Sequence, residues 1–163
     1  MEKVIIREIN ESEIPFLTEM LYEALFVPSG EKKLPKEILK EPKIYNYVKD
    51  FGRKDDFCFV AEYRNELIGA IWSRKFTAEN KGYGFINEET PELSMAIIES
   101  SRGKGIGQKL LNTIFAKLAN ENFKQVSLSV DKRNFAFKMY QKNGFEEIEM
   151  ENNSVKMLKI IKK

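Results

Sequence analysis

A strand, a glycine-rich turn and a helix follow one another in residues 93–118, and this succession constrains the fold more than any other part of the chain. The apolar run "LSMAII" (93–98) predicts the strand, and "SRGKGIG" (101–107) places glycines at 103, 105 and 107. The apolar residues that follow recur at helical spacing: Ile106, Leu110, Leu111, Ile114 and Leu118. Glycine is a poor helix former, so three glycines where a helix begins indicate that another group approaches this backbone closely.

The turn has the features of an anion-binding site. The first N–H groups of a helix have no partner within the helix, and the helix dipole makes this end positive. Arg102 and Lys104 lie between the glycines and add charge. One glycine would suit a tight turn that needs positive φ, whereas three glycines with two cations favour an anion site.

The rest of the sequence predicts an α/β (α+β) domain with a mixed, mostly antiparallel sheet flanked by helices. Strands are expected at 3–9, 57–63, 67–76, 93–98 and 125–130, followed by a last hairpin turning at Asn152-Asn153. Helices are expected from an N-cap at Ser12 to about Phe26, from 106, and over 134–143 before Gly144, with one or two short helices before Gly52. Without repeats or a long linker, residues 1–163 are predicted to form one domain.

The composition excludes several kinds of catalysis. The chain has no histidine, which excludes Ser-His-Asp and Cys-His catalysis and nearly all structural zinc sites, and we expect no metal. A general base must therefore be a carboxylate, a lysine, a tyrosine or water. The single cysteine, Cys58, forms no internal disulfide and is interpreted as an inert core residue.

We expect a cytoplasmic protein, monomeric or homodimeric, without a membrane anchor. No run approaches the ~20 apolar residues of a membrane span, and the start "MEKVIIREIN" lacks the pattern of a signal peptide. Residues 102–142 contain nine lysines and arginines against two acidic residues, while residues 1–101 contain fourteen against nineteen. These opposite balances predict two ligand regions of opposite charge preference. A phosphate-rich ligand accounts for the basic region, and we expect no nucleic acid.

The glycine-rich turn does not fully match either of two nucleotide-binding motifs. The Walker A motif is absent, because Gly107 is followed by Gln108 and Lys109. A dinucleotide fingerprint needs G-x-G-x-x-G, and only one βαβ unit is visible. Asp131 ends the next strand, where it could bind a ribose or cap the following helix. Binding of NAD or ATP stays an alternative.

Two motifs together resemble those of the GNAT N-acetyltransferase superfamily. Arg102, Gly105 and Gly107 match its acyl-CoA motif, [RQ]-x-x-G-x-[GA]. About 30 residues on, "NFAFKMYQKNGF" (134–145) is similar to its second motif, with the alanine one place early at Ala136. The residues that match the second motif are Asn134, Tyr140, Gly144 and Phe145. The family often has proline at the position of Glu99.

The resemblance implies acetyl-CoA as the co-substrate, lying between two splayed central strands. Backbone groups of the first strand would pair with the pantetheine arm and polarise the thioester, and the turn would bind the pyrophosphate. The 3′-phosphate could contact Lys132, Arg133 or Lys138. The binding residues implied are Met95, Ala96, Ile97, Ile98, Arg102, Gly103, Lys104, Gly105, Ile106, Gly107, Gln108, Asn134, Phe137 and Tyr140.

The implied reaction is transfer of an acetyl group to an amine by direct attack. Within its motif Tyr140 becomes the candidate acid for the departing thiolate; taken alone, it would be a core residue. Glu92 could accept the amine proton directly or through water, or could be a solvated loop carboxylate. Trp72 is interpreted as a packing residue. A non-catalytic acyl-CoA sensor on the same fold is the second hypothesis.

Acidic residues gather where the family binds its acceptor, in residues 20–52 and 77–92. They are Glu23, Glu31, Glu37, Glu41, Asp50, Glu79, Glu88, Glu89 and Glu92. Their charge predicts a cationic amine: a polyamine, an aminoglycoside, or a peptide N-terminus or lysine.

Overall fold

A seven-stranded sheet in the order β1-β2-β3-β4-β5-β7-β6 organises the chain in the computed structural model, which describes residues 3–162. All neighbouring strands are antiparallel except β4 and β5, which are parallel. The strands are β1 (Ile5–Glu8), β2 (Phe57–Tyr63), β3 (Glu66–Arg74), β4 (Glu92–Ile97), β5 (Gln125–Asp131), β6 (Glu146–Glu151) and β7 (Ser154–Ile160). The helices are α1 (Phe16–Ala24), α2 (Pro42–Tyr45), α3 (Ile106–Asn120) and α4 (Ala136–Lys142). This arrangement confirms the predicted fold class.

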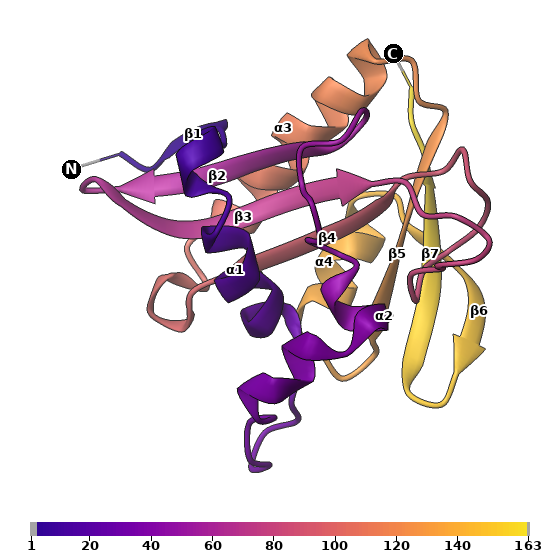
Figure 1. The fold of residues 1–163 in the computed structure, drawn as a ribbon, viewed down its shortest axis with the longest axis horizontal. Helices are drawn as coiled ribbons and strands as arrows, with labels where there is room; N and C mark the ends of the chain where they lie inside the picture. The colour runs from indigo at the N-terminus through magenta and orange to yellow at the C-terminus, as the bar shows by residue number, and fades with distance from the viewer. Residues whose placement is uncertain (1–2, 163) are drawn as a thin grey trace.

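Each face of the sheet has its own core. In Figure 1, α1 and α2 lie in front of the sheet and α3 and α4 lie behind it. The apolar stripe of α3 is buried against β2–β5 and β7, as its spacing predicted. On the other face Leu17, Met20 and Leu21 of α1 pack with Trp72 of β3. Trp72 is buried, which confirms that it is a packing residue.

The last hairpin forms where the sequence predicted it, and the strands predicted at 57–63 and 67–76 form another. Arg64 and Asn65 join β2 to β3, and both have positive φ, as a two-residue type I′ turn requires. Asn152 begins the β6–β7 turn with φ 55°. Gly144 follows α4 with φ 94°, a helix ending that glycine adopts without strain.

The start of the first helix differs from the prediction. Ser12 does not cap α1 but lies within a 3₁₀ turn, η1 (Glu11–Glu13). Asn10 precedes this turn, and its N–H donates to the Glu13 carboxylate at 2.9 Å. Because Pro15 has no N–H to donate, it fits the position where α1 begins. The strand expected over 3–9 is shorter, Ile5–Glu8.

The two parallel strands at the centre separate soon after they begin. Their one paired position is Glu92 with Ser127, and the Ser127 N–H donates to the Pro91 carbonyl at 3.0 Å. Beyond this point β4 continues along β3, while β5 pairs with β7 along its whole length. In Figure 1, β5, β6 and β7 therefore run at a steep angle to β2, β3 and β4.

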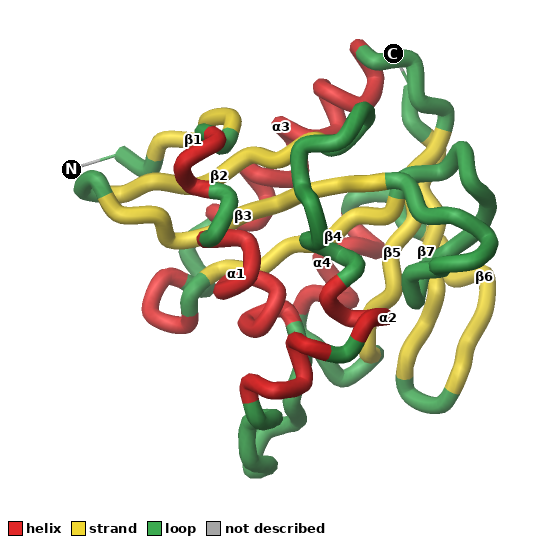
Figure 2. Tube along the Cα trace, viewed as in Figure 1, coloured by secondary structure: helices red, strands yellow, loops and turns green. Residues whose placement is uncertain are grey.

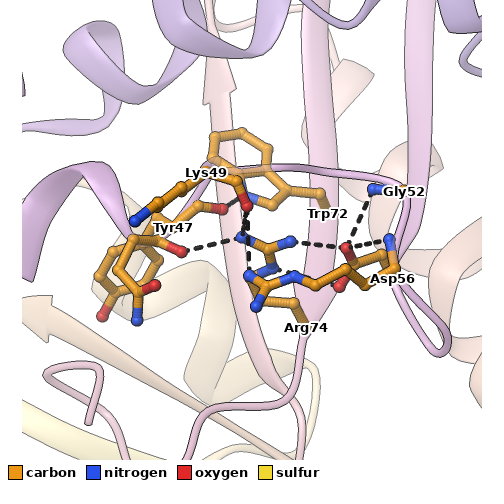
Figure 3. A network of polar contacts seen from close by, with 8 residues as sticks. Tyr47, Lys49, Gly52, Asp56, Trp72 and Arg74 are labelled. Carbon is orange, nitrogen blue, oxygen red and sulfur yellow. Dashed lines mark hydrogen bonds and ion pairs between the residues drawn. The ribbon is translucent and has the colours of Figure 1, made fainter. Parts of the chain in front are cut away.

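Two long connections, residues 46–56 and 75–91, are drawn as loops in Figure 2 and contact each other where the Tyr83 N–H donates to the Tyr47 hydroxyl at 2.8 Å. Residues 46–56 are fixed to β3 by Arg74, whose buried guanidinium forms two hydrogen bonds with Asp56, at 3.1 and 2.6 Å. Arg74 also donates to the carbonyls of Asn46 and Lys49, as Figure 3 shows for this network. Removing one partner of such a buried pair typically costs ~3–5 kcal/mol, so this connection is held firmly.

Across residues 3–162, no helix is both long and apolar enough to cross a membrane.

Candidate active site

Beyond Glu92, no strand among residues 3–162 pairs with the edge of β4 that faces β5. In an antiparallel pair, alternate residues direct their N–H and C=O groups to the partner strand. The Ile98 N–H donates to Ile68 at 2.9 Å, so Ile98 and Ala96 face β3. Met95 and Ile97 therefore direct their N–H and C=O groups to the open edge. Of the four residues suggested for the pantetheine arm, the backbone groups of these two are therefore positioned to pair with a ligand.

Arg102 lies against the end of this edge. Its Nε donates to the Ile97 carbonyl at 2.8 Å, and its Nη2 lies 3.3 Å from the Glu23 carboxylate on α1. The half-exposed guanidinium is thus hydrogen-bonded to the last carbonyl of β4 and links this strand to α1. Of the backbone groups that Met95 and Ile97 direct to this edge, the Ile97 carbonyl is thus occupied, and both groups of Met95 and the Ile97 N–H remain to pair with a ligand.

The turn before α3 combines left-handed backbone with open space. Gly103 and Gly105 have φ 76° and 80°, and a Cβ added to either would meet no atom within 4 Å. Among the described residues, the N–H groups of Gly103 and of residues 105–108 have no hydrogen-bond acceptor. Exposed Lys104 lies between these glycines. These are the properties of an anion site at a helix N-terminus.

The third glycine has another role. Gly107 is buried, and a Cβ there would lie 3.3 Å from Met139 on α4 and 3.5 Å from Ile97 on β4. It therefore permits close packing of α3, α4 and β4 and does not provide space for a ligand. Buried Ile106 is likewise a core residue, and the Gln108 side chain bonds to Asn143 at the end of α4. These contacts hold the turn, α4 and the edge of β4 together.

The turn between β5 and α4 is ordered by its own polar residues. Asn134 Oδ1 accepts a hydrogen bond from the Ala136 N–H at 2.9 Å, just before α4 begins, and Phe135 stands at the N-cap position of that helix. Asp131 accepts from the backbone and guanidinium of Arg133, which lowers the pKa of Asp131. Asp131 thus forms the turn before α4, and its carboxylate is occupied, which weakens the NAD alternative.

The cations suggested for the 3′-phosphate differ in their contacts. Arg133 pairs with Asp131 at 2.8 Å, and Lys132 pairs with Glu147 at 2.7 Å. Lys138, on α4, forms no ion pair with a described residue. Half-buried Phe137 packs at the edge of the core and lies 5.8 Å from the Lys132 ammonium.

Tyr140 lies in the core beside the turn. Its ring packs edge-on against Phe145 with centroids 5.6 Å apart, and its side chain is only 7% exposed. Burial raises the pKa of the Tyr140 phenol, so the hydroxyl stays protonated and can donate. Among the described residues, nothing accepts a hydrogen bond from this hydroxyl.

Glu92 is a buried strand residue and not a solvated loop carboxylate. It is 2% exposed at the first position of β4. The Tyr47 hydroxyl donates to its Oε2, and the Gly84 N–H donates to its Oε1 at 3.1 Å. Burial raises the pKa of Glu92 to about 7, although both hydrogen bonds oppose this shift. A carboxyl group with a pKa near neutrality is suited to general base catalysis.

Comparison with known proteins agrees with this geometry. The family model described as Acetyltransferase (GNAT) family matches residues 16–145. The chain belongs to the GNAT acetyltransferase family. Among curated proteins no relative matches. Acetyl-CoA is the co-substrate of the family, and membership supports an acetyl-transfer function for this chain.

Solved structures share the GNAT fold at low identity. The PaiA N-acetyltransferase of Thermoplasma acidophilum, solved in complex with coenzyme A, is 19% identical with a TM-score of 0.72, covering 97% of this chain and 99% of its own. The ribosomal-protein-alanine N-acetyltransferase of Brucella melitensis is 21% identical with a TM-score of 0.68, covering 96% and 99%. A GNAT acetyltransferase of Staphylococcus aureus Mu50 is 18% identical with a TM-score of 0.70, covering 98% and 100%.

The carboxylates expected on the acceptor side of this GNAT protein do not form one cluster. Glu23 pairs with Arg102, Glu92 is buried, and Asp50 lines a cavity of about 750 Å³ beside the start of β2. In residues 20–52 six lysines alternate with the five acidic residues. Only the loop 77–91 keeps an acidic excess, so the argument for a cationic acceptor rests on that loop.

Sequence reasoning missed the partners of Glu92. Tyr47 follows α2 by two positions, and nothing in its neighbourhood resembles a GNAT motif. The one available signal was "GYG" (82–84), because paired glycines in a loop indicate a close backbone approach. A Cβ on Gly82 would overlap the Glu92 carboxylate, and one on Gly84 would lie 2.7 Å from the Leu128 backbone of β5.

Proposed function

We propose that this protein is an N-acetyltransferase that moves an acetyl group from acetyl-CoA to an amine by direct attack. The observation that supports this most is the adjacency of two sets of unpaired backbone groups. Within the part of the chain that the structure describes, the edge of β4 beyond Glu92 lacks a partner strand, and the turn before α3 has N–H groups without acceptors. Gly107 packs beside Ile97, so the two sets lie next to each other.

These groups fit the two chemical parts of the co-substrate. The Met95 carbonyl and N–H and the Ile97 N–H would pair with the amides of the pantetheine arm, and an N–H on this edge would stabilise charge on the thioester oxygen. Gly103, Lys104 and residues 105–108 would bind the pyrophosphate. Acetyl-CoA supplies the activated acetyl group, and the protein supplies position, donors and a base.

Proton transfer is assigned to two residues. Because Glu92 is 2% exposed, we propose that it takes the amine proton through a water molecule. Tyr140 would donate a hydrogen bond or proton to the departing thiolate, since its phenol is neutral and has no acceptor among the described residues. A neutral amine needs no activation beyond loss of this proton, which suits a chain without histidine.

The second candidate, a non-catalytic acyl-CoA sensor, would bind the same ligand without turnover. Tyr140 favours the enzyme, because it stands in the second motif as a candidate acid for the departing thiolate, a role that a passive site does not need. Release of free thiol from acetyl-CoA in the presence of a panel of amines separates the two. Turnover supports the enzyme, and tight CoA binding without turnover supports the sensor.

Two matched substitutions test the turn. Gly105→Asn keeps the left-handed backbone, which asparagine tolerates, and adds a side chain where the pyrophosphate would lie. Gly30→Asn is the control, because Gly30 has φ 87° and equally open space away from the turn. Gly105→Asn should weaken CoA binding about tenfold or more by calorimetry, and Gly30→Asn should not. Equal CoA affinity in both variants would refute the assignment.

A further inference from the structure

The Tyr47 hydroxyl links three segments at the start of β4. It donates to Glu92 Oε2 and accepts a hydrogen bond from the Tyr83 N–H at 2.8 Å. The adjacent Gly84 N–H donates to the other oxygen of Glu92. One phenol and one carboxylate therefore hold the loop around residues 82–84 against β4, and Gly82 allows its backbone to come this close.

Tyr47 is itself fixed in place. Its carbonyl accepts a hydrogen bond from Trp72 Nε1 at 3.1 Å, and its ring packs on Phe76 with centroids 4.9 Å apart. The preceding residue, Asn46, is bonded through its carbonyl to Arg74. As Figure 3 shows, Trp72 and Arg74 both reach this segment from β3. Packing and hydrogen bonds therefore fix the Tyr47 hydroxyl in the position from which it donates to Glu92.

The other charged and polar groups around Glu92 are few. Lys43 on α2 and Lys156 on β7 act on it as distant positive charges. Arg74, its neighbour on β3, is already paired with Asp56. Ser127, its partner on β5, has a buried hydroxyl without a hydrogen bond among the described residues. The Tyr47 hydroxyl is thus the one side chain among the described residues that bonds directly to the Glu92 carboxylate.

We propose that Tyr47 is a positioning residue that determines the basicity of Glu92 during acetyl transfer. The proposal rests on the proposed function, in which Glu92 is the base. By donating to Oε2, Tyr47 stabilises the ionised carboxylate against the cost of burial and keeps it able to accept a proton near neutral pH. Burial and the nearby carboxylate raise the pKa of Tyr47, so its own proton stays on the phenol.

Tyr47→Phe tests this with little change in shape. Loss of the donor should raise the pKa of Glu92 by about one to two units, the size of a hydrogen bond to a charged group. The acid limb of kcat/KM should move to higher pH by the same amount. A purely structural role would instead lower the rate equally at every pH. Tyr45→Phe, at an exposed phenol two residues away, is the matched control and should change neither quantity.

Two readouts keep the outcomes separate. ¹³C NMR of protein labelled at the glutamate Cδ gives the pKa of Glu92 without any acceptor, and Glu92→Gln identifies its signal. Thiol release with the fastest amine of the panel gives the pH profile. In the Glu92→Gln background, Tyr47→Phe should leave that profile unchanged. Thermal unfolding of each variant shows that it is folded.

Every result then has a defined meaning. A raised NMR pKa with a shifted acid limb supports the proposal. An unchanged NMR pKa in folded Tyr47→Phe overturns it and leaves the proposed function intact. A raised pKa with an unmoved limb shows that Glu92 is not the base, which overturns the proposal and that catalytic assignment. Absence of turnover with every amine refutes the proposed function, while the NMR titration still reports on the Tyr47–Glu92 link.

Discussion

Replacing Tyr140 by phenylalanine isolates the chemical contribution of one hydroxyl. The ring would keep its edge-on packing against Phe145, at 5.6 Å between centroids. Because the hydroxyl donates to no described residue, no internal hydrogen bond is lost, and the free energy of unfolding should change by less than about 1 kcal/mol. CoA affinity should also stay the same, since the interaction strengthens only as the sulfur gains charge.

The expected loss is in kcat. An alkyl thiol leaves fairly easily, with a pKa near ~8.5, so assistance should lie at the lower end of general acid catalysis, about 100-fold. This corresponds to about 2.7 kcal/mol of transition-state stabilisation. Stopped-time thiol release measures kcat, calorimetry measures CoA binding, and Tyr45→Phe is the control for loss of a phenol elsewhere. If kcat stays within twofold of the wild type, Tyr140 is a packing residue and the acid must be water.

Three further predictions concern charge. CoA affinity should fall as salt rises, and Lys104→Ala should reduce both the affinity and its salt dependence. Calorimetry at two ionic strengths measures both effects. If neither appears, phosphate does not bind at this turn. Burial raises the pKa of Glu92 from 4.5 to about 7, so the folded state favours the protonated carboxyl group. The wild type should therefore lose up to about 3 kcal/mol of stability relative to Glu92→Gln as pH rises from 4.5 to 7, with no further loss above 7. Denaturant unfolding across this pH range measures it, and a constant difference would mean that Glu92 titrates normally. Cationic amines should have higher kcat/KM than acidic amines of equal size if the acidic excess of loop 77–91 faces the acceptor, and faster turnover of acidic amines would refute that argument.

Local patterns were sufficient for most of the elements and for the position of the glycine-rich turn. The stripe of α3, the hairpin turns at Asn65 and Asn152, and the end of α4 at Gly144 follow from spacing and from residues that tolerate positive φ. The start of α1 was misplaced, because Ser12 lies in the 3₁₀ turn that Asn10 precedes and α1 begins only after Pro15.

The separation of β4 from β5 was implied by the family resemblance and not by any residue in the two strands. Strand periodicity shows which side chains share a face but does not show where pairing stops. The structure alone shows that pairing ends after Glu92 and Ser127 and that the open edge presents Met95 and Ile97. It also shows that Gly107 serves packing, whereas Gly103 and Gly105 leave open space.

By itself the sequence indicated the kind of chemistry through a glycine-rich helix start suited to an anion and the lack of histidine, whereas the roles of Tyr140 and Glu92 were implied only by the family resemblance. These features are local, since a turn, a helix start and a missing residue type can be recognised without knowing what lies nearby. Only the tertiary structure determined the state of those residues. Burial raises the pKa of Glu92, while Tyr47, 45 positions earlier, and Gly84 bond to its carboxylate from two loops and oppose this shift. Desolvation and hydrogen bonding depend on which distant groups exclude water, and spacing along the chain does not contain that information.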